Sequence, residues 1–182
     1  MKLAAVLYDI GEGAAADALL TSLALRLRRA GFKLAGAVQS NVAVAGRRHS
    51  EIVLEDLASA GRVDVSQYRG PLARGCRLDE RALEYCAGIA VSSLEPDTDL
   101  VVVNRFGKRE AEGHGFRLMI EQAVVLGVPV LAGLSRAHLE AWRTFVGEEP
   151  VLLPPDMARV ASWCVAKVSD RRSKPLYAGM LG

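Results

Sequence analysis

The sequence predicts an α/β protein in which a mostly parallel sheet is flanked by helices. The first observation is a set of continuous apolar runs at residues 3–7, 100–103 and 128–132, which are typical of strands covered on both faces. The second is that segments with helical spacing follow these runs. The third is that glycine or polar residues come soon after each run. Such residues would lie at the carboxyl edge, where open α/β sheets bind their ligands.

Length and composition predict one domain over residues 1–168 and a polar tail over residues 169–182. With 182 residues, 51% of them hydrophobic, the chain can bury a sizeable core. A formal net charge of +2 gives no reason to expect a nucleic-acid or membrane partner. No apolar run approaches the roughly 20 residues that cross a bilayer.

The three cysteines, Cys76, Cys86 and Cys164, predict reduced thiols rather than disulfides. They are odd in number and widely spaced, and neither a Cys-x-x-Cys pair nor a secretory leader accompanies them. We therefore expect a cytoplasmic protein.

The first strand, over residues 2–8, leads into a glycine-rich turn over residues 9–16. We expect a helix to begin at Asp17 and to stop at Gly31. A strand, a glycine-rich turn and a helix N-terminus together present backbone N–H groups to an anion. The predicted anion ligands of this turn are Gly11, Glu12, Gly13, Ala14, Ala15, Ala16 and Asp17.

This turn lacks the side chains of a working phosphate loop, which needs a lysine for the outer phosphates and a hydroxyl for magnesium. The chain has Ala14 to Ala16 and then Asp17 at these places. Asp17 suits the helix dipole but would repel a triphosphate unless a metal lay between them. The alternative is that small residues merely let the helix pack closely on the strand.

A second strand, over residues 33–38, ends at Gln39, Ser40 and Asn41. These neutral donors and acceptors suit ligand selection better than acid–base chemistry. They could equally form an ordinary strand-to-turn exit.

Residues 42–75 interrupt the layering with turn signals and short alternating segments, which predicts a hairpin insertion. Its final loop, with the residues after it, could close over a bound anion. The candidate lid residues are Arg69, Arg74, Cys76 and Arg77. A solvated connection is the alternative.

The remaining elements follow from apolar spacing and capping residues. Asp79 is a good N-cap for a helix. We expect the inner face of that helix to consist of Ala82, Cys86, Ile89 and Ala90. We further expect a helix over residues 116–126, a helix capped by Ser135 that runs through Phe145, a strand over residues 151–153 and a helix over residues 157–168.

The central strand delivers polar and charged residues to the same edge of the sheet. Asn104 and Arg105 follow the apolar run directly, and Lys108 and Glu110 come after a turn at Gly107. A solvated charged turn after a buried strand is the alternative.

The segment 99–110 resembles the second nucleotide-binding motif of THEP-type nucleoside-triphosphatases. More closely, the chain resembles a bacterial family of unknown function described as NTPase-like, some members of which are encoded near molybdate transport or molybdenum-cofactor proteins. The matching features are Gln39 after Gly36, Gln67 and Gly70, residues 76–79, residues 104–113, and the Pro129 strand followed by Trp142 and Phe145. The resemblance implies a three-layer P-loop NTPase-like fold.

The departures from the active relatives bear on hydrolysis. Asn104 stands where they have the magnesium-binding aspartate, and Arg105 stands where they have the adjacent acid. Gly107, Lys108 and Glu110 match the motif. Because phosphoryl transfer depends on charge-neutralising positioning, these losses and the missing loop lysine argue against ordinary hydrolysis.

Three hypotheses follow. The first is a non-hydrolysing protein that binds a nucleotide or oxyanion, such as molybdate, in the old phosphate cleft. The second is an enzyme with Lys108 and Glu110 as catalytic candidates. In it Lys108, or an arginine of residues 69–77, would replace the missing loop lysine, and Glu110 or Asp17 would hold Mg²⁺ with the nucleotide. The third is a scaffold protein with no ligand in the cleft. A homo-oligomer would fit any of them, and the sequence assigns no metal site.

Overall fold

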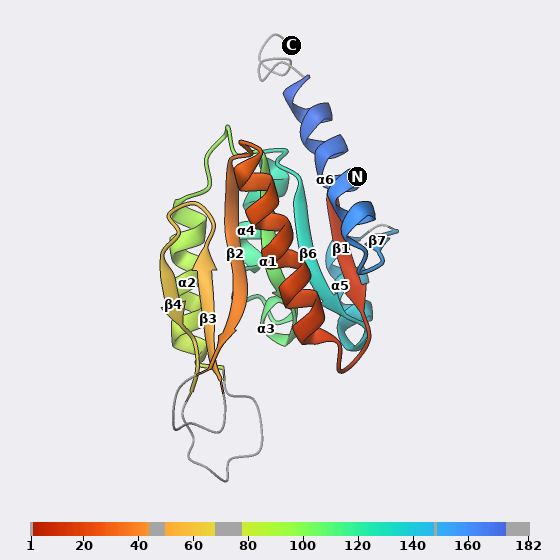
Figure 1. Cartoon of the computed structure of the whole chain (residues 1–182). Helices are drawn as coiled ribbons and strands as arrows, with labels where there is room; N and C mark the ends of the chain where they lie inside the picture. The colour runs from red at the N-terminus through yellow and green to blue at the C-terminus, as the bar shows by residue number, and fades with distance from the viewer. Residues whose placement is uncertain (1, 44–49, 68–77, 148, 174–182) are drawn as a thin grey trace.

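The computed structural model describes residues 2–43, 50–67, 78–147 and 149–173. Seven strands form one sheet in the order β4-β3-β2-β5-β6-β1-β7 (Figure 1). The strands are β1 (Leu3–Tyr8), β2 (Leu34–Val42), β3 (Glu51–Asp56), β4 (Arg62–Asp64), β5 (Leu100–Phe106), β6 (Val130–Ser135) and β7 (Val151–Leu153). Five of these are mutually parallel, whereas β3 and β4 run antiparallel beside β2.

Helices cover both faces of this sheet. They are α1 (Gly13–Arg29), α2 (Glu80–Ser92), α3 (Lys108–Ala111), α4 (Arg117–Val125), α5 (Leu139–Val146) and α6 (Met157–Arg172). Buried residues of α1 and α6 pack on one face, and those of α2, α4 and α5 pack on the other. The three-layer α/β architecture is that of a P-loop NTPase-like fold, and the predicted fold class is therefore confirmed.

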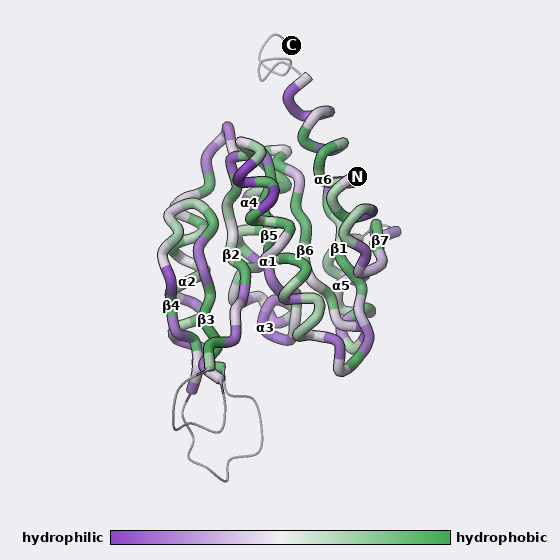
Figure 2. The backbone as a smooth tube through the Cα atoms, viewed as in Figure 1, coloured by the Kyte–Doolittle hydropathy of each residue, from purple (hydrophilic) through white to green (hydrophobic). Residues whose placement is uncertain are grey.

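The parallel strands are buried on both faces because their side chains alternate between the two cores. Val101 and Val103 of β5 pack with α2 and α4, while Leu100 and Val102 pack with α1 and α6. All four are fully buried. Figure 2 shows hydrophobic residues, in green, along β6 and β1. The unbroken apolar run that predicted a central strand thus reflects burial on both sides.

The predicted hairpin insertion is present as β3 and β4, whose register pairs Leu54 with Val63. Asp79 caps α2 as expected, since its Oδ1 accepts hydrogen bonds from the backbone N–H groups of Arg81 and Ala82. Two of the predicted inner-face residues of α2, Cys86 and Ala90, are fully buried, whereas Ala82 and Ile89 are half-buried.

Several predicted boundaries were wrong. Helix α1 begins at Gly13 rather than Asp17, because Ala14 to Ala16 are strong helix formers and continue the helix instead of the turn. Helix α6 continues past residue 168 to Arg172. The guanidinium of Arg172 holds this last turn by pairing with the buried Asp99, with Nη2 2.5 Å from Oδ2.

Two further differences lie near the carboxyl edge of the sheet. Ser135 does not cap a helix with its side chain; a 3-10 turn, Arg136–His138, comes between β6 and α5. Helix α3 was not predicted, and it forms directly after Gly107 because the Glu110 carboxylate accepts the Gly107 N–H at 2.9 Å. Among the described helices, none combines the length and apolar character needed to cross a membrane.

One glycine permits a close approach of two central strands. Gly36 of β2 has a φ of +101°, and a Cβ at this position would lie 2.0 Å from the carbonyl oxygen of Val102 in β5. A side chain here would therefore strain the backbone and collide with a neighbouring strand that cannot move aside.

We predict that Gly36→Ala lowers the free energy of unfolding by roughly 3 kcal/mol or more, because it combines a disfavoured φ with a backbone clash. Gly88→Ala is the matched control. Gly88 lies on the exposed side of α2 with open space around its Cβ position. Its replacement by alanine should therefore raise the free energy of unfolding by about 0.5–1 kcal/mol. Denaturant titration of both variants measures the difference, and an equal effect at the two positions would contradict the strand geometry.

Candidate functional site

The candidate site lies where the carboxyl ends of the parallel strands meet the N-terminus of α1, at the lower edge of the sheet in Figure 1. This is the edge at which open α/β sheets bind ligands. Tyr8 ends β1, Gln39 belongs to β2, and Asn104 and Arg105 belong to β5. Asp17 of α1 comes to the same place from the first turns of the helix.

Asp17 is the centre of a hydrogen-bonded cluster and is only 3% exposed. Its carboxylate accepts two hydrogen bonds from Arg105, Nε to Oδ1 at 3.1 Å and Nη2 to Oδ2 at 2.6 Å. This two-point geometry is the strongest way in which a guanidinium binds a carboxylate. The sequence had suggested that Asp17 presents a free negative charge to the cleft. The structure shows instead that Arg105 neutralises this charge.

Two amide side chains complete the cluster. The Nδ2 of Asn104 donates to Oδ1 of Asp17 at 3.0 Å, and Nε2 of Gln39 donates to Oδ2 at 3.2 Å. The Oδ1 of Asn104 accepts the backbone N–H of Gln39 at 2.9 Å. Both the oxygen and the nitrogen of the Asn104 amide thus bind protein groups, and these hydrogen bonds connect β2, β5 and α1.

Arg105 lies over the glycine turn. Its side chain is 44% exposed, and a Cβ at Gly13 would be 3.0 Å from its Nη2. The guanidinium therefore occupies space that opens because residue 13 has no side chain. Partial burial disfavours its charge, but the hydrogen bonds and proximity of Asp17 outweigh this and raise the pKa of Arg105 above its usual value.

A hollow of about 420 Å³ opens beside Arg105, and we call it the α1 hollow. The residues that line it are Tyr8, Ile10, Gly11, Gly13, Ala14, Arg105, Phe106, Gly107, Ser135 and His138. The glycine turn and the arginine corner therefore share one cavity. The first-turn N–H groups of α1 have no acceptor within the helix and carry the positive end of its dipole, so the hollow suits an anion.

Tyr8 is a buried residue that lines the α1 hollow and carries a hydroxyl group. Burial raises the pKa of its hydroxyl, and the nearby Arg105 charge offsets only part of that rise. The phenol is therefore protonated at neutral pH and can donate a hydrogen bond.

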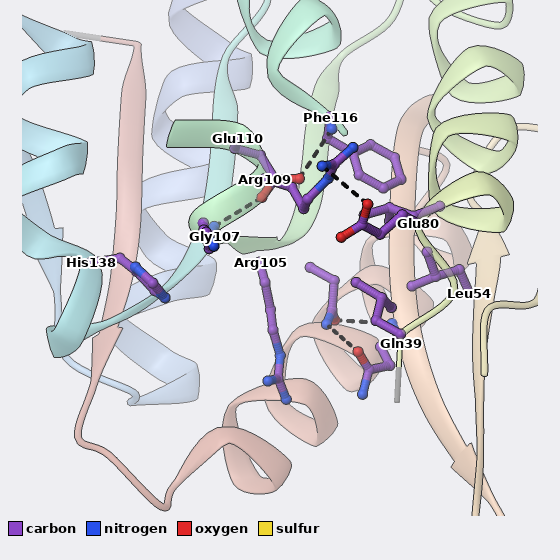
Figure 3. Close-up of a pocket in the computed structure, with 13 residues that line it drawn as sticks. Gln39, Leu54, Glu80, Arg105, Gly107, Arg109, Glu110, Phe116 and His138 are labelled. Carbon is purple, nitrogen blue, oxygen red and sulfur yellow. Dashed lines mark hydrogen bonds and ion pairs between the residues drawn. The ribbon is translucent and has the colours of Figure 1, made fainter. Parts of the chain in front are cut away.

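A second cavity of about 430 Å³ adjoins the first on the side of α2, and we call it the apolar cavity. Its lining residues are Gln39, Leu54, Leu78, Glu80, Leu83, Asn104, Arg105, Gly107, Lys108, Arg109, Glu110, Phe116 and His138. Figure 3 shows Arg105 between His138 on one side and Gln39 on the other. Arg105, Gly107 and His138 line both cavities, so the two spaces are adjacent.

Some predicted ligand residues lie away from the α1 hollow. The Ser40 hydroxyl points to the other side of β2 and accepts from Arg62 at 3.5 Å. Asn41 is exposed and accepts from Gln39 at 3.3 Å. Glu12 uses its carboxylate to accept the backbone N–H of Asp9, and neither Ala15 nor Ala16 is among the lining residues.

The two catalytic candidates have different surroundings. Lys108 is 79% exposed along its side chain and lies 3.6 Å from Glu112. Glu110 is buried, and its two carboxylate oxygens accept the backbone N–H groups of Gly107 and Phe116 at 2.9 and 3.1 Å. Burial raises the pKa of Glu110 despite these bonds. The geometry gives Glu110 a structural role, and a catalytic role for either residue stays a prediction.

The candidate lid residues Arg69, Arg74, Cys76 and Arg77 lie outside the described residues. Within the described ranges, no cluster of three or more His, Cys, Asp or Glu side chains is arranged to hold a metal ion.

Sequence reasoning missed Tyr8 and His138. Tyr8 was assigned only to the first strand, although its position just before the glycine turn places it at the carboxyl edge. His138 follows β6 by three residues and reaches both cavities because the 3-10 turn directs the chain back over the strand ends. The position of each after a buried strand was the available signal.

Comparison with known proteins gives two matches. The family described as a protein of unknown function (DUF2478) matches residues 3–163. The chain is also 31% identical over 162 residues, which is 89% of its length, to a protein of Bradyrhizobium diazoefficiens named molybdenum import ATP-binding protein ModC 2. The chain spans 18% of the length of that relative. No solved structure gives a significant match.

We predict that Asp17 and Arg105 are strongly coupled in stability. A double-mutant cycle with Asp17→Asn and Arg105→Ala should give a coupling free energy of about 1–2 kcal/mol, because Asp17 is buried although Arg105 is partly exposed. The exposed pair Glu140 and Arg143 is the matched control and should couple by less than about 0.5 kcal/mol. Similar coupling in the two cycles would contradict a special role for the Asp17–Arg105 pair.

Proposed function

The chain belongs to the family of proteins of unknown function DUF2478, and from this premise we propose that it is a P-loop-like protein that binds an oxyanion without hydrolysing a nucleotide. The anion would lie in the α1 hollow, against Arg105 and the first-turn N–H groups of α1. A free oxyanion and the terminal phosphate of a nucleotide present the same chemistry to these groups.

The observation that carries this proposal is the fixed orientation of Arg105. Asp17 accepts the Nε hydrogen and one hydrogen of Nη2, so the Nη1 hydrogens and the second Nη2 hydrogen stay available for a ligand. An arginine held by a carboxylate loses little side-chain freedom when it binds an anion, which lowers the cost of binding. Tyr8 adds a neutral donor to the same cavity.

The surroundings of Asn104 and Asp17 argue against ordinary hydrolysis. Phosphoryl transfer needs a magnesium ligand after the central strand and a cation on the outer phosphates. Asn104 supplies an amide that is already engaged, and the charge of Asp17 is neutralised by Arg105. Lys108 lines the apolar cavity and not the α1 hollow, so it is poorly placed to replace the loop lysine.

The name of the Bradyrhizobium relative makes molybdate a reasonable first ligand to test. Molybdate is a tetrahedral oxyanion, as are sulfate and phosphate, so all three suit the same donors. We also propose a cytoplasmic location, which agrees with the free buried thiols of Cys86 and Cys164, and a small anion rather than a nucleic acid as the partner.

We predict that molybdate, sulfate or phosphate raises the melting temperature without magnesium. A ligand at 100 times its dissociation constant adds about 2.7 kcal/mol, which corresponds to roughly 5–10 °C for a chain of this size. Arg105→Ala should abolish the shift, and Arg143→Ala, which removes an exposed arginine from α5, should keep it. Differential scanning fluorimetry with an oxyanion and nucleotide series measures this.

Two results would overturn the proposal. The first is a rise in melting temperature with a nucleotide that requires magnesium, together with release of phosphate that Glu110→Ala abolishes. This result would identify an enzyme. The second is an unchanged melting temperature with all of these anions, which would favour the hypothesis of a scaffold protein with no ligand in the cleft.

A further inference from the structure

We propose that the ligand of this site is an organic anion, with its phosphate or carboxylate in the α1 hollow at Arg105 and an apolar body of about one ring in the apolar cavity. The inference rests on the proposed function, because it takes the same anion site as its starting point. It adds the chemical class of the rest of the ligand.

The floor of the apolar cavity is built from large hydrophobic side chains of separate elements. Leu54 of β3, Leu83 of α2 and Phe116 before α4 are 4%, 7% and 3% exposed, and the half-buried Leu78 joins them. Its volume of about 430 Å³ is within the range of small-molecule sites, roughly 300–1,000 Å³. A bare tetrahedral oxyanion has no apolar surface to place against this floor.

The two cavities are adjacent, because they share three lining residues. Arg105, Gly107 and His138, which Figure 3 labels, line both of them, and the guanidinium of Arg105 is held by Asp17. A ligand whose anionic group contacts the guanidinium from the α1 hollow can therefore extend past it into the apolar cavity.

The polar groups around the apolar cavity favour an apolar body over a nucleobase. Both ends of the Asn104 amide and the Nε2 of Gln39 already bond to protein groups, so few donors or acceptors remain to recognise the edge of a base. One buried donor of a lining residue is unsatisfied: the Nε of Arg109 has no hydrogen-bond partner among the described residues. An ether or ester oxygen that joins the anion to its body is the type of acceptor this group could use.

The charged groups at the rim of the apolar cavity are compatible with an anion. The cationic lining residues are Arg105, Lys108 and Arg109, and the acidic ones are Glu80 and Glu110. Burial raises the pKa of Glu110, and the carboxylate of Glu80 lies 3.3 Å from Arg109. Each of these cations also has a carboxylate partner, so directed hydrogen bonds and not a net positive charge would hold the anion.

Isothermal titration calorimetry on the full chain tests the inference with inorganic phosphate, methyl phosphate and phenyl phosphate. We expect phenyl phosphate to bind with a dissociation constant at least tenfold lower than that of methyl phosphate, because only the ring reaches the apolar floor. Phenol, which lacks the anion, should bind at least tenfold more weakly than phenyl phosphate.

Two tryptophan variants locate the ring. Leu78→Trp places a large side chain in the apolar cavity from a half-buried position and should remove the advantage of phenyl phosphate while it leaves the affinity for inorganic phosphate within twofold. Leu118→Trp is the matched control, since Leu118 is 52% exposed on α4 and lines neither cavity. Leu83→Ala, which trims the floor, is a second variant if Leu78→Trp does not fold.

The outcomes separate the two proposals. If inorganic phosphate binds in an Arg105-dependent manner but phenyl phosphate binds no tighter than methyl phosphate, the inference fails and the proposed function stands. If phenyl phosphate binds equally well to Arg105→Ala, both fail, because the anion site is not used. Tighter binding of adenosine monophosphate than of phenyl phosphate, unaffected by Leu78→Trp, would also overturn the inference.

Discussion

The ion pair between Asp17 and Arg105 is the interaction on which the candidate site depends. It joins the first helix to the central strand across 88 residues of sequence. It also combines a buried carboxylate and a half-buried guanidinium, each of which is unfavourable to bury alone, in one neutral unit. The amides of Asn104 and Gln39 complete the bonding of the carboxylate. The outer edge of the guanidinium is then the part that remains for a ligand, over a turn where Gly13 leaves room for it.

This arrangement explains how a phosphate-loop geometry can persist with altered chemistry. The backbone elements are those of an anion site: a strand, a turn at Gly11 and a helix N-terminus. The side chains differ from those of a phosphate loop, because the positive charge comes from Arg105 of β5 and is balanced by Asp17. A charge-balanced cleft favours a small anion held by directional hydrogen bonds over a triphosphate that needs strong neutralisation.

Much of the fold could be predicted from the sequence, because burial on both faces produces unbroken apolar runs such as residues 100–103. Asp79 and the hairpin insertion were similarly visible in local chemistry. The pairing of Asp17 with Arg105 was not, since the sequence assigned each residue a separate role and only the strand order brings them together. His138 was missed for the same reason. The acceptance of two backbone N–H groups by Glu110 was not foreseen either, because it depends on a short helix that was not expected.

The most direct test is nuclear magnetic resonance of the arginine Nε–H groups in ¹⁵N-labelled protein, with the Arg105 signal assigned by its loss in Arg105→Lys. The Asp17 hydrogen bond should protect this proton from solvent exchange, and addition of phosphate or molybdate without magnesium should shift its resonance in a saturable manner. A rapidly exchanging Arg105 signal, or a protected one that no oxyanion or organic phosphate moves, would contradict an anion site built on a carboxylate-held arginine.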